Sequence, residues 1–272
     1  MHIFSPEQYN GILHNRGCGI SYIQRNHKIP FSAVPSDSWF FQENLCDKIA
    51  IDVPWCLIEP HEGEFNWNHP EWEGCFNSWI DNGYKVHLKV RGMDTLGTLY
   101  DQGTPQWVFD AGAKYIDEPI EFYRNTWLLN NIPSDRKQPI RYPLYWDEIY
   151  LEKTDALIAE LGERYNGNPA IESVSISHVG RWGEMHVADH YKPEIWVEHG
   201  FTVERYNQAL IRTIDSYRRA FPDKQLSLSL GRPIYIDGIT VKDAWPAIDH
   251  AVANNVMLKF DGLGHSYEFG SG

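Results

Sequence analysis

The amino-acid sequence predicts an α/β fold of the TIM (β/α)8-barrel type. Segments typical of strands and of helices alternate along the chain, and such alternation with short connections predicts a parallel sheet with helices outside it. One strand segment, KVHLKVR at residues 85–91, alternates charged or imidazole side chains with Val and Leu. A doubly wound sheet is covered by helices on both faces and has nearly all-apolar strands, whereas the mouth of a barrel accepts polar side chains. The polar alternation therefore favours the barrel.

Six segments are predicted as strands, because each alternates apolar and polar residues or forms a short apolar run. They are residues 19–23, 48–55, 84–90, 171–177, 225–230 and 256–260. A closed barrel needs eight units, and about six βα units are visible. An open six-stranded sheet leaves two unpaired edges. We therefore expect either that some strands are not evident in the sequence, or that the barrel is incomplete, with C-terminal units missing or with a homo-oligomer or a second chain completing it.

Four segments are predicted as helices, and each of them precedes a strand. They are residues 70–82, 145–165, 202–221 and 240–254. The first begins with Pro70 and ends before Gly83, which is the usual asymmetry of helix ends. The second has an apolar stripe on one face and is followed by Asn-Gly-Asn-Pro, a strong stop signal.

A long insertion, residues 92–143, interrupts the third βα unit. It is rich in Trp, Tyr, Pro and Gly. Connections of this length are usually functional or disordered, and the aromatic content argues against disorder. With 272 residues, of which 42% are hydrophobic, the chain can form one large core. We predict a single barrel domain, residues 1–272, that carries this insertion.

Composition excludes several classes of partner. The net charge is −13, from 24 Lys and Arg against 37 Asp and Glu, which argues against binding to nucleic acid or to an anionic membrane. The sequence contains no run of 18 apolar residues, so we expect no membrane-spanning helix. The first residues do not resemble a signal peptide. We expect a cytoplasmic protein, or a secreted one whose signal has been removed. The 11 Trp residues fit either a heavy core or a cleft for carbohydrate.

The most informative segment is IESVSISHVGRWGEMH, residues 171–186. A regular strand turns abruptly into a glycine-rich stretch and delivers Glu184 at the carboxyl end of the strand, where parallel barrels place their chemistry. Trp182 offers a ring that can stack on a sugar, and Glu184 can act as a proton donor. Burial beside Trp182 would raise the pKa of Glu184, as an apolar wall does. The alternative is a structural Glu that caps the next helix.

Four segments together resemble the superfamily of (β/α)8 retaining glycoside hydrolases of the β-galactosidase and cellulase type. They are IDVPWCLIEPHEGEFNW at residues 51–67, TPQW at 104–107, YNGNPAI at 165–171 and GRWGE at 180–184. The last lies where that superfamily has its acid/base residue. One departure is that Gly183 stands where Asn is usual, so the contact with the sugar 2-hydroxyl is unassigned. The chain resembles a truncated or divergent member.

The resemblance implies that Glu184 is the acid/base and that a second carboxylate, normally at the end of a seventh strand, is the nucleophile. Glu268, in the segment His-Ser-Tyr-Glu-Phe at 265–269, is the candidate, with His265 and Tyr267 as substrate contacts. The alternative is a nucleophile outside this sequence. Arg91, at the end of the third strand, is expected to support a catalytic carboxylate, or to form a simple ion pair in the lumen.

Further aromatic and polar residues follow the strands and are candidates for sugar binding. They are Trp55, Trp107, His178 and Trp182. For each of the Trp residues a place in the core is an equal alternative, and His178 also fits a satisfied polar group. Glu59 in the second-strand motif is expected to be structural and to tie its loop.

Other chemistries are weakly supported by the sequence. There is no GxGxxG, no GxxxxGK[ST] and no HExxH, so we expect no nucleotide cofactor and no metal; His186 and His190, four residues apart, leave a metal-dependent hydrolase as a minor alternative. The prediction is a glycoside hydrolase that acts on O-glycosidic bonds of an oligo- or polysaccharide. Its rival is a non-catalytic carbohydrate-binding protein, or an incomplete barrel that needs a partner chain.

Overall fold

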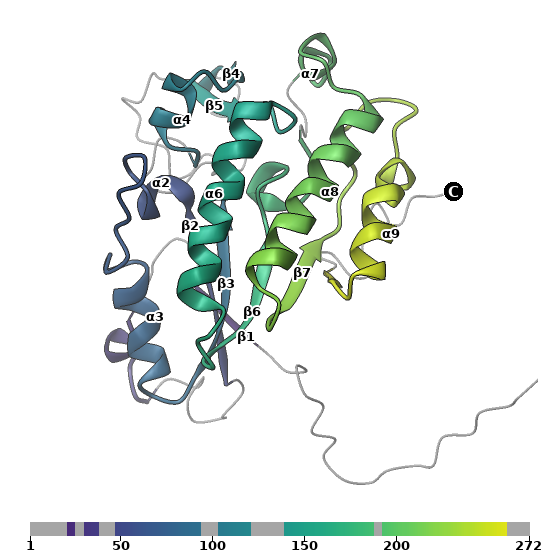
Figure 1. The fold of residues 1–272 in the computed structure, drawn as a ribbon. Coiled ribbons are helices and arrows are strands. Elements are labelled where there is room, and N and C mark those ends of the chain that lie inside the picture. The colour runs from purple at the N-terminus through teal and green to yellow at the C-terminus, as the bar shows by residue number, and fades with distance from the viewer. Residues whose placement is uncertain are drawn as a thin grey trace, which may run out of the picture.

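A computed structural model describes residues 21–24, 30–37, 47–93, 103–120, 139–187 and 192–259. All six predicted strands are present in it, within a residue or two of their predicted limits. They are β1 (Ser21–Gln24), β2 (Lys48–Pro54), β3 (Lys85–Arg91), β6 (Ile171–Ile176), β7 (Gln225–Ser229) and β8 (Met257–Lys259). The prediction of an α/β fold is confirmed (Figure 1).

These strands form one parallel sheet in the order β1-β2-β3-β6-β7-β8. Each strand therefore pairs with the next strand of the sheet along the chain, as successive right-handed βα units do. Within the described ranges β1 and β8 are the two edges of the sheet, and closure into an eight-unit barrel is not seen there.

One face of the sheet is apolar and is covered by helices. The long helices are α3 (Glu73–Ile80), α6 (Glu148–Tyr165), α8 (Val203–Ala220) and α9 (Trp245–Ala253), and they lie side by side in front of the sheet in Figure 1. On this side the strands contribute buried Ile, Val and Leu side chains, among them Ile51, Leu88 and Ile176. The four predicted helices are thus confirmed, with the last one preceded by the short helix η4 (Val241–Ala244).

The other face of the sheet is polar, as the alternation in the sequence predicted. The register places Asp52 opposite Lys89, and His87 opposite Ser173. The His87 imidazole bridges two strands, with Nδ1 at 2.7 Å from the Ser173 hydroxyl and Nε2 at 2.7 Å from the Ser175 hydroxyl. Side chains of one parity therefore share a face and contact one another across β2, β3 and β6.

Helix α6 begins where the sequence provides a cap. The Asp147 carboxylate accepts hydrogen bonds from the backbone N–H groups of Ile149, at 3.1 Å, and Tyr150, at 3.2 Å, which satisfies donors at the helix start. The helix ends at Tyr165, just before the Asn-Gly-Asn-Pro stop. Its Gly162 allows close packing on α8, because a Cβ there would overlap Ala220.

The predicted insertion contains structure that the sequence did not reveal. It holds helix α4 (Gln106–Asp110) and an antiparallel ribbon of β4 (Tyr115–Glu118) with β5 (Ile140–Pro143). Short helices elsewhere were also not predicted: η1 (Phe31–Ala33), α2 (Trp55–Ile58), η3 (Arg181–Gly183) and α7 (Glu194–Glu198). In the described part of the chain no helix combines the length and the apolar character needed to cross a membrane.

Candidate active site

The loop that carries Glu184 has an unusual backbone. Four of its residues have positive φ: Gly180 at 92°, Trp182 at 52°, Gly183 at 70° and Met185 at 71°. Positive φ is uncommon for residues other than glycine, and residues held there cost free energy that the surrounding structure must supply. Such strain clusters at functional sites, so the loop is a candidate on its backbone alone.

Close packing fixes this conformation. At Gly183 a Cβ would lie 2.6 Å from the Ser177 Cα, so no side chain fits there in this conformation. An Asn at this position is therefore excluded by Ser177, the residue that follows β6. Met185 is fully buried and its carbonyl accepts a hydrogen bond from the Tyr206 hydroxyl of α8, at 3.0 Å.

A buried ion pair ties the same loop to the ribbon in the insertion. Arg181 Nη2 lies 2.6 Å from Glu118 Oε2, and both side chains are 1% exposed. The Arg181 guanidinium also stacks over the Tyr142 ring of β5, 4.5 Å from its centroid. The insertion thus supports the loop that delivers Glu184.

The Glu184 carboxylate faces a cation of the neighbouring strand. Lys89 Nζ donates to Glu184 Oε1 at 3.4 Å, and the two side chains are 7% and 15% exposed. Burial lowers the pKa of Lys89, while the charges of Asp52 and Glu184 act in the opposite direction. The Trp182 ring packs on His186, with 5.5 Å between centroids. The Glu184 carboxylate therefore contacts the Lys89 ammonium group. The sequence predicted only the apolar ring of Trp182 beside it.

Arg91 forms an ion pair with Asp52, with Nε at 2.5 Å from Oδ1. Two alternatives were expected for Arg91, support of a catalytic carboxylate or a simple ion pair. This geometry fits the simple ion pair. Asp52 stands opposite Lys89 in the sheet, so the polar face carries a chain of alternating charges at its carboxyl end. We call Asp52, Lys89, Arg91 and Glu184 the strand-end cluster. Next to it, burial and then the charge of Lys259 lower the pKa of His87 to about 4.

Two predicted sugar contacts lie in the interior instead. Trp55 is fully buried and its indole N–H donates to Glu59 Oε2 at 2.8 Å. His178 is fully buried on the helix side, 2.9 Å from the Tyr217 hydroxyl through Nδ1, and burial lowers its pKa to about 3. The His178 ring also packs edge-on against Trp55, with 6.0 Å between centroids. Packing accounts for both residues, and this placement disfavours sugar contacts by either one.

The structural role expected for Glu59 is confirmed. Its second carboxylate oxygen accepts from the backbone N–H of Gly63 at 2.9 Å, so the side chain closes the loop after α2. Burial is the largest influence on this group and raises the pKa of Glu59. Trp107 packs edge-on against Trp55, with 5.7 Å between centroids, and donates to the Glu59 carbonyl at 3.1 Å.

The described part of the structure leaves several predicted site residues untested. Trp107 and Trp182 are half-buried, and their sugar contacts stay predictions. Glu268, His265, Tyr267 and His190 lie outside the described residues. Where side chains are described, no group of three or more His, Cys, Asp or Glu is arranged to hold a metal ion.

Sequence reasoning missed Lys89 and Asp52 as parts of the site. The signal was present, because both have the inward parity that identified the polar face. Only the strand register, which pairs Asp52 with Lys89, brings them together beside Glu184.

No family model and no curated protein matches this chain. Among solved structures it is similar to a β-galactosidase from the psychrophilic Marinomonas ef1, with a TM-score of 0.51 and 11% identity over 90% of this chain and 40% of that one. Endo-glycoceramidase II from Rhodococcus sp. gives a TM-score of 0.44, 14% identity, and coverage of 78% and 48%. An exo-β-1,4-mannosidase from Opitutaceae bacterium strain TAV5 gives 0.45, 10%, and coverage of 73% and 28%.

The chain spans less than half the length of each of these enzymes. At such low identity the likeness to the β-galactosidase describes the fold alone. The resemblance to glycoside hydrolases read from the sequence is confirmed at that level.

Proposed function

We propose that the protein is a glycoside hydrolase that cleaves O-glycosidic bonds of an oligo- or polysaccharide, with Glu184 as its acid/base. One observation carries the proposal: the Glu184 carboxylate lies at the carboxyl end of β6, beside Lys89 on the polar face, in a loop held at positive φ. The fold shared with a β-galactosidase supports it. On this proposal residues 1–272 form one barrel domain, and 92–143 is its insertion.

The chemistry has two steps in the proposed mechanism. Glu184 gives its proton to the glycosidic oxygen as the C–O bond breaks, while a second carboxylate attacks the anomeric carbon and forms a glycosyl ester. Glu184, now a carboxylate, then takes a proton from water as that water attacks the anomeric carbon and releases the ester. Glu268 is the candidate for the second carboxylate, and a nucleophile outside this sequence is the alternative.

Lys89 has a positioning role in this mechanism. Its ammonium group holds Glu184 by a charge-assisted hydrogen bond, and the Asp52–Arg91 ion pair packs beside it. The three residues keep the acid/base at a fixed place on the sheet, which is what a catalytic carboxylate needs to meet the glycosidic oxygen. Trp182 and Trp107 remain candidates for sugar platforms.

The direct test is Glu184→Gln, assayed on a panel of aryl glycosides that begins with the β-galactoside. We expect kcat to fall by about 10²- to 10⁴-fold, the range for loss of a general acid/base, while the variant stays folded. Glu152→Gln is the matched control, because Glu152 is exposed on α6. Full activity of the Glu184 variant would remove this residue from the mechanism.

A second candidate is a non-catalytic carbohydrate-binding protein, or an incomplete barrel that works with a partner chain. The observation in its favour is that β1 and β8 are unpaired edges in the described ranges. Saturable sugar binding by calorimetry, with no turnover of any aryl glycoside, supports this candidate over the first.

A further inference from the structure

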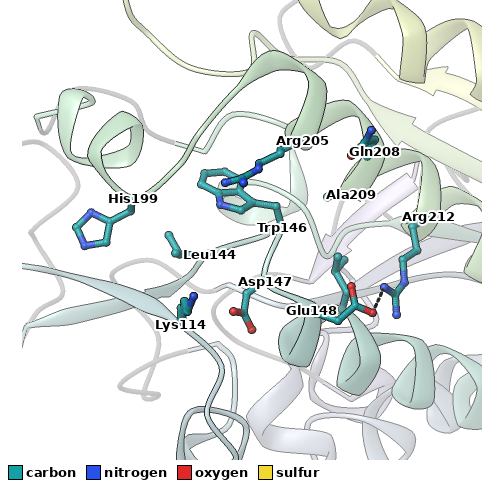
Figure 2. Close-up of a pocket in the computed structure, with 11 residues that line it drawn as sticks. Lys114, Leu144, Trp146, Asp147, Glu148, His199, Arg205, Gln208, Ala209 and Arg212 are labelled. Atoms are coloured by element: carbon teal, nitrogen blue, oxygen red, sulfur yellow. Dashed lines mark hydrogen bonds and ion pairs between the residues drawn. The ribbon is translucent and has the colours of Figure 1, made fainter.

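A hollow of about 510 Å³ lies on the helix side of the sheet, where the start of α6 meets α8. Figure 2 shows the side chains that line it. They include Lys114, Trp146, Asp147, Glu148, Arg205 and Arg212. Its volume is in the range of small-ligand sites. The strand-end cluster does not line it, so the hollow is separate from the candidate active site.

A rigid indole forms part of the wall. Trp146 is half-buried, and it packs on two buried side chains, Trp196 at 6.1 Å and Phe201 at 5.7 Å between centroids. Buried Leu144 and Ala209 also line the hollow. An aromatic ring fixed in this way offers an apolar surface that costs little conformational entropy to use.

Two of the three cations in the lining have no carboxylate partner among the described side chains. The Asp147 carboxylate keeps its charge, but it caps backbone N–H groups at the positive end of α6. Glu148 accepts from Arg212 at 2.6 Å, and Arg212 also donates to Asp155 at 2.9 Å. Arg205 donates to the Gly200 carbonyl at 3.3 Å, which does not neutralise its charge. Lys114 is exposed, and no ion pair of its ammonium group occurs among the described side chains.

Two cations without a carboxylate partner thus line one hollow of a chain whose net charge is −13. Attraction to an anionic group is the expected result, since guanidinium and ammonium groups bind carboxylates through charge-assisted hydrogen bonds. His199 adds an acceptor: its Nδ1 lies 2.8 Å from the Ile195 carbonyl and donates to it, so Nε2 of the neutral ring accepts.

We propose that this hollow binds an acidic saccharide, a sugar unit that carries a carboxylate. The Trp146 ring packs on the C–H face of the sugar, Lys114 and Arg205 bind the carboxylate, and His199 and Gln208 bind hydroxyls. The site needs no catalysis and does not depend on the function of Glu184.

Calorimetry with trigalacturonate tests the proposal, with neutral galactotriose as the matched probe. We expect saturable binding of the acidic trisaccharide, at least tenfold weaker binding of the neutral one, and a loss of at least tenfold in Arg205→Ala and in Lys114→Ala. Arg218→Ala is the control, because Arg218 is exposed on the same helix but does not line the hollow. Arg205→Lys keeps the charge and should retain most of the affinity.

Glu184→Gln separates this site from the active site. It should bind trigalacturonate as the unmodified protein does, whether or not Glu184 proves to be catalytic. The proposal is overturned if the acidic trisaccharide does not bind saturably, if the neutral one binds equally well, or if Arg205→Ala and Lys114→Ala bind normally while Glu184→Gln does not.

Discussion

Single residues decide the shape of the loop that carries Glu184. Gly180 and Gly183 adopt positive φ at little cost, whereas Trp182 and Met185 do so against their preference. The Met185 side chain is buried and its carbonyl is bound by Tyr206, so tertiary contacts offset the strain. The site is therefore sensitive to changes that add even one carbon atom to the loop.

Gly183→Ala should destabilise the protein by about 2–4 kcal/mol, because the new Cβ would overlap Ser177 and because φ is positive there. Urea unfolding measures the loss. Gly167→Ala is the control: Gly167 has no atom within 4 Å of a Cβ and no positive φ, so its change should stay within about 0.5 kcal/mol. Equal effects of the two substitutions would contradict the tight packing at Gly183.

Two histidines make stability depend on pH in a definite direction. The folded-state pKa is lowered to about 4 for His87 and to about 3 for His178, while an unfolded histidine titrates near 6.5. Between these values the unfolded chain binds more protons, so stability is full above about pH 6.5 and falls as the pH is lowered toward 4 and then 3.

Urea unfolding at pH 7, 5 and 4 should therefore give a steadily lower free energy of unfolding. His87→Gln should reduce the slope of the free energy of unfolding between pH 6 and 4.5 by close to one proton. An unaltered slope in the His87 variant would show that His87 is not kept neutral by the fold.

Much of the candidate site at this scale could be predicted. Glu184 follows a regular strand, and its place at the strand end came from the alternation alone. Lys89 could be assigned to the same face but not to contact with Glu184, because that contact depends on how β3 pairs with β6. Trp55 and His178 are predicted as sugar contacts because they follow strands. A side chain at such a position can also point into the helix layer.

At the scale of elements, the β4–β5 ribbon supports the loop that carries Glu184 through the Arg181–Glu118 pair. The long helices α6 and α8 were predictable, since each has a clear stripe and stop signals. The ribbon was not predictable, because strands of four residues inside an aromatic-rich insertion give too short a pattern.

Glu118→Ala should cost about 3–5 kcal/mol, since it removes the fully buried carboxylate that pairs with Arg181. Asp117→Ala on the same strand is the control, because Asp117 pairs with Arg141 at a more exposed place and such pairs contribute about 0–1 kcal/mol. Chemical denaturation compares the two. A loss below 1 kcal/mol in the Glu118 variant would mean that the ribbon does not hold the loop.

At the scale of the whole molecule, the sheet separates two surfaces of different chemistry. The helix layer covers the apolar face (Figure 1), and the strand-end cluster lies on the polar face. The alternation of the strands predicted this division, and a barrel places its active site on the same side. The number of units in the barrel could not be predicted in the same way, because closure depends on segments that pair with β1 and β8.

The dependence of rate on the leaving group tests the role of Glu184 most directly. A general acid matters most when the departing phenolate is basic, and little when it is a stabilised dinitrophenolate. We predict that Glu184→Gln loses kcat/KM on phenyl glycosides but retains most of it on dinitrophenyl glycosides, on which kcat still falls because Glu184 is also the base of the second step. An equal loss of kcat/KM on both substrates, or no loss on either, would contradict the assignment of Glu184 as the proton donor.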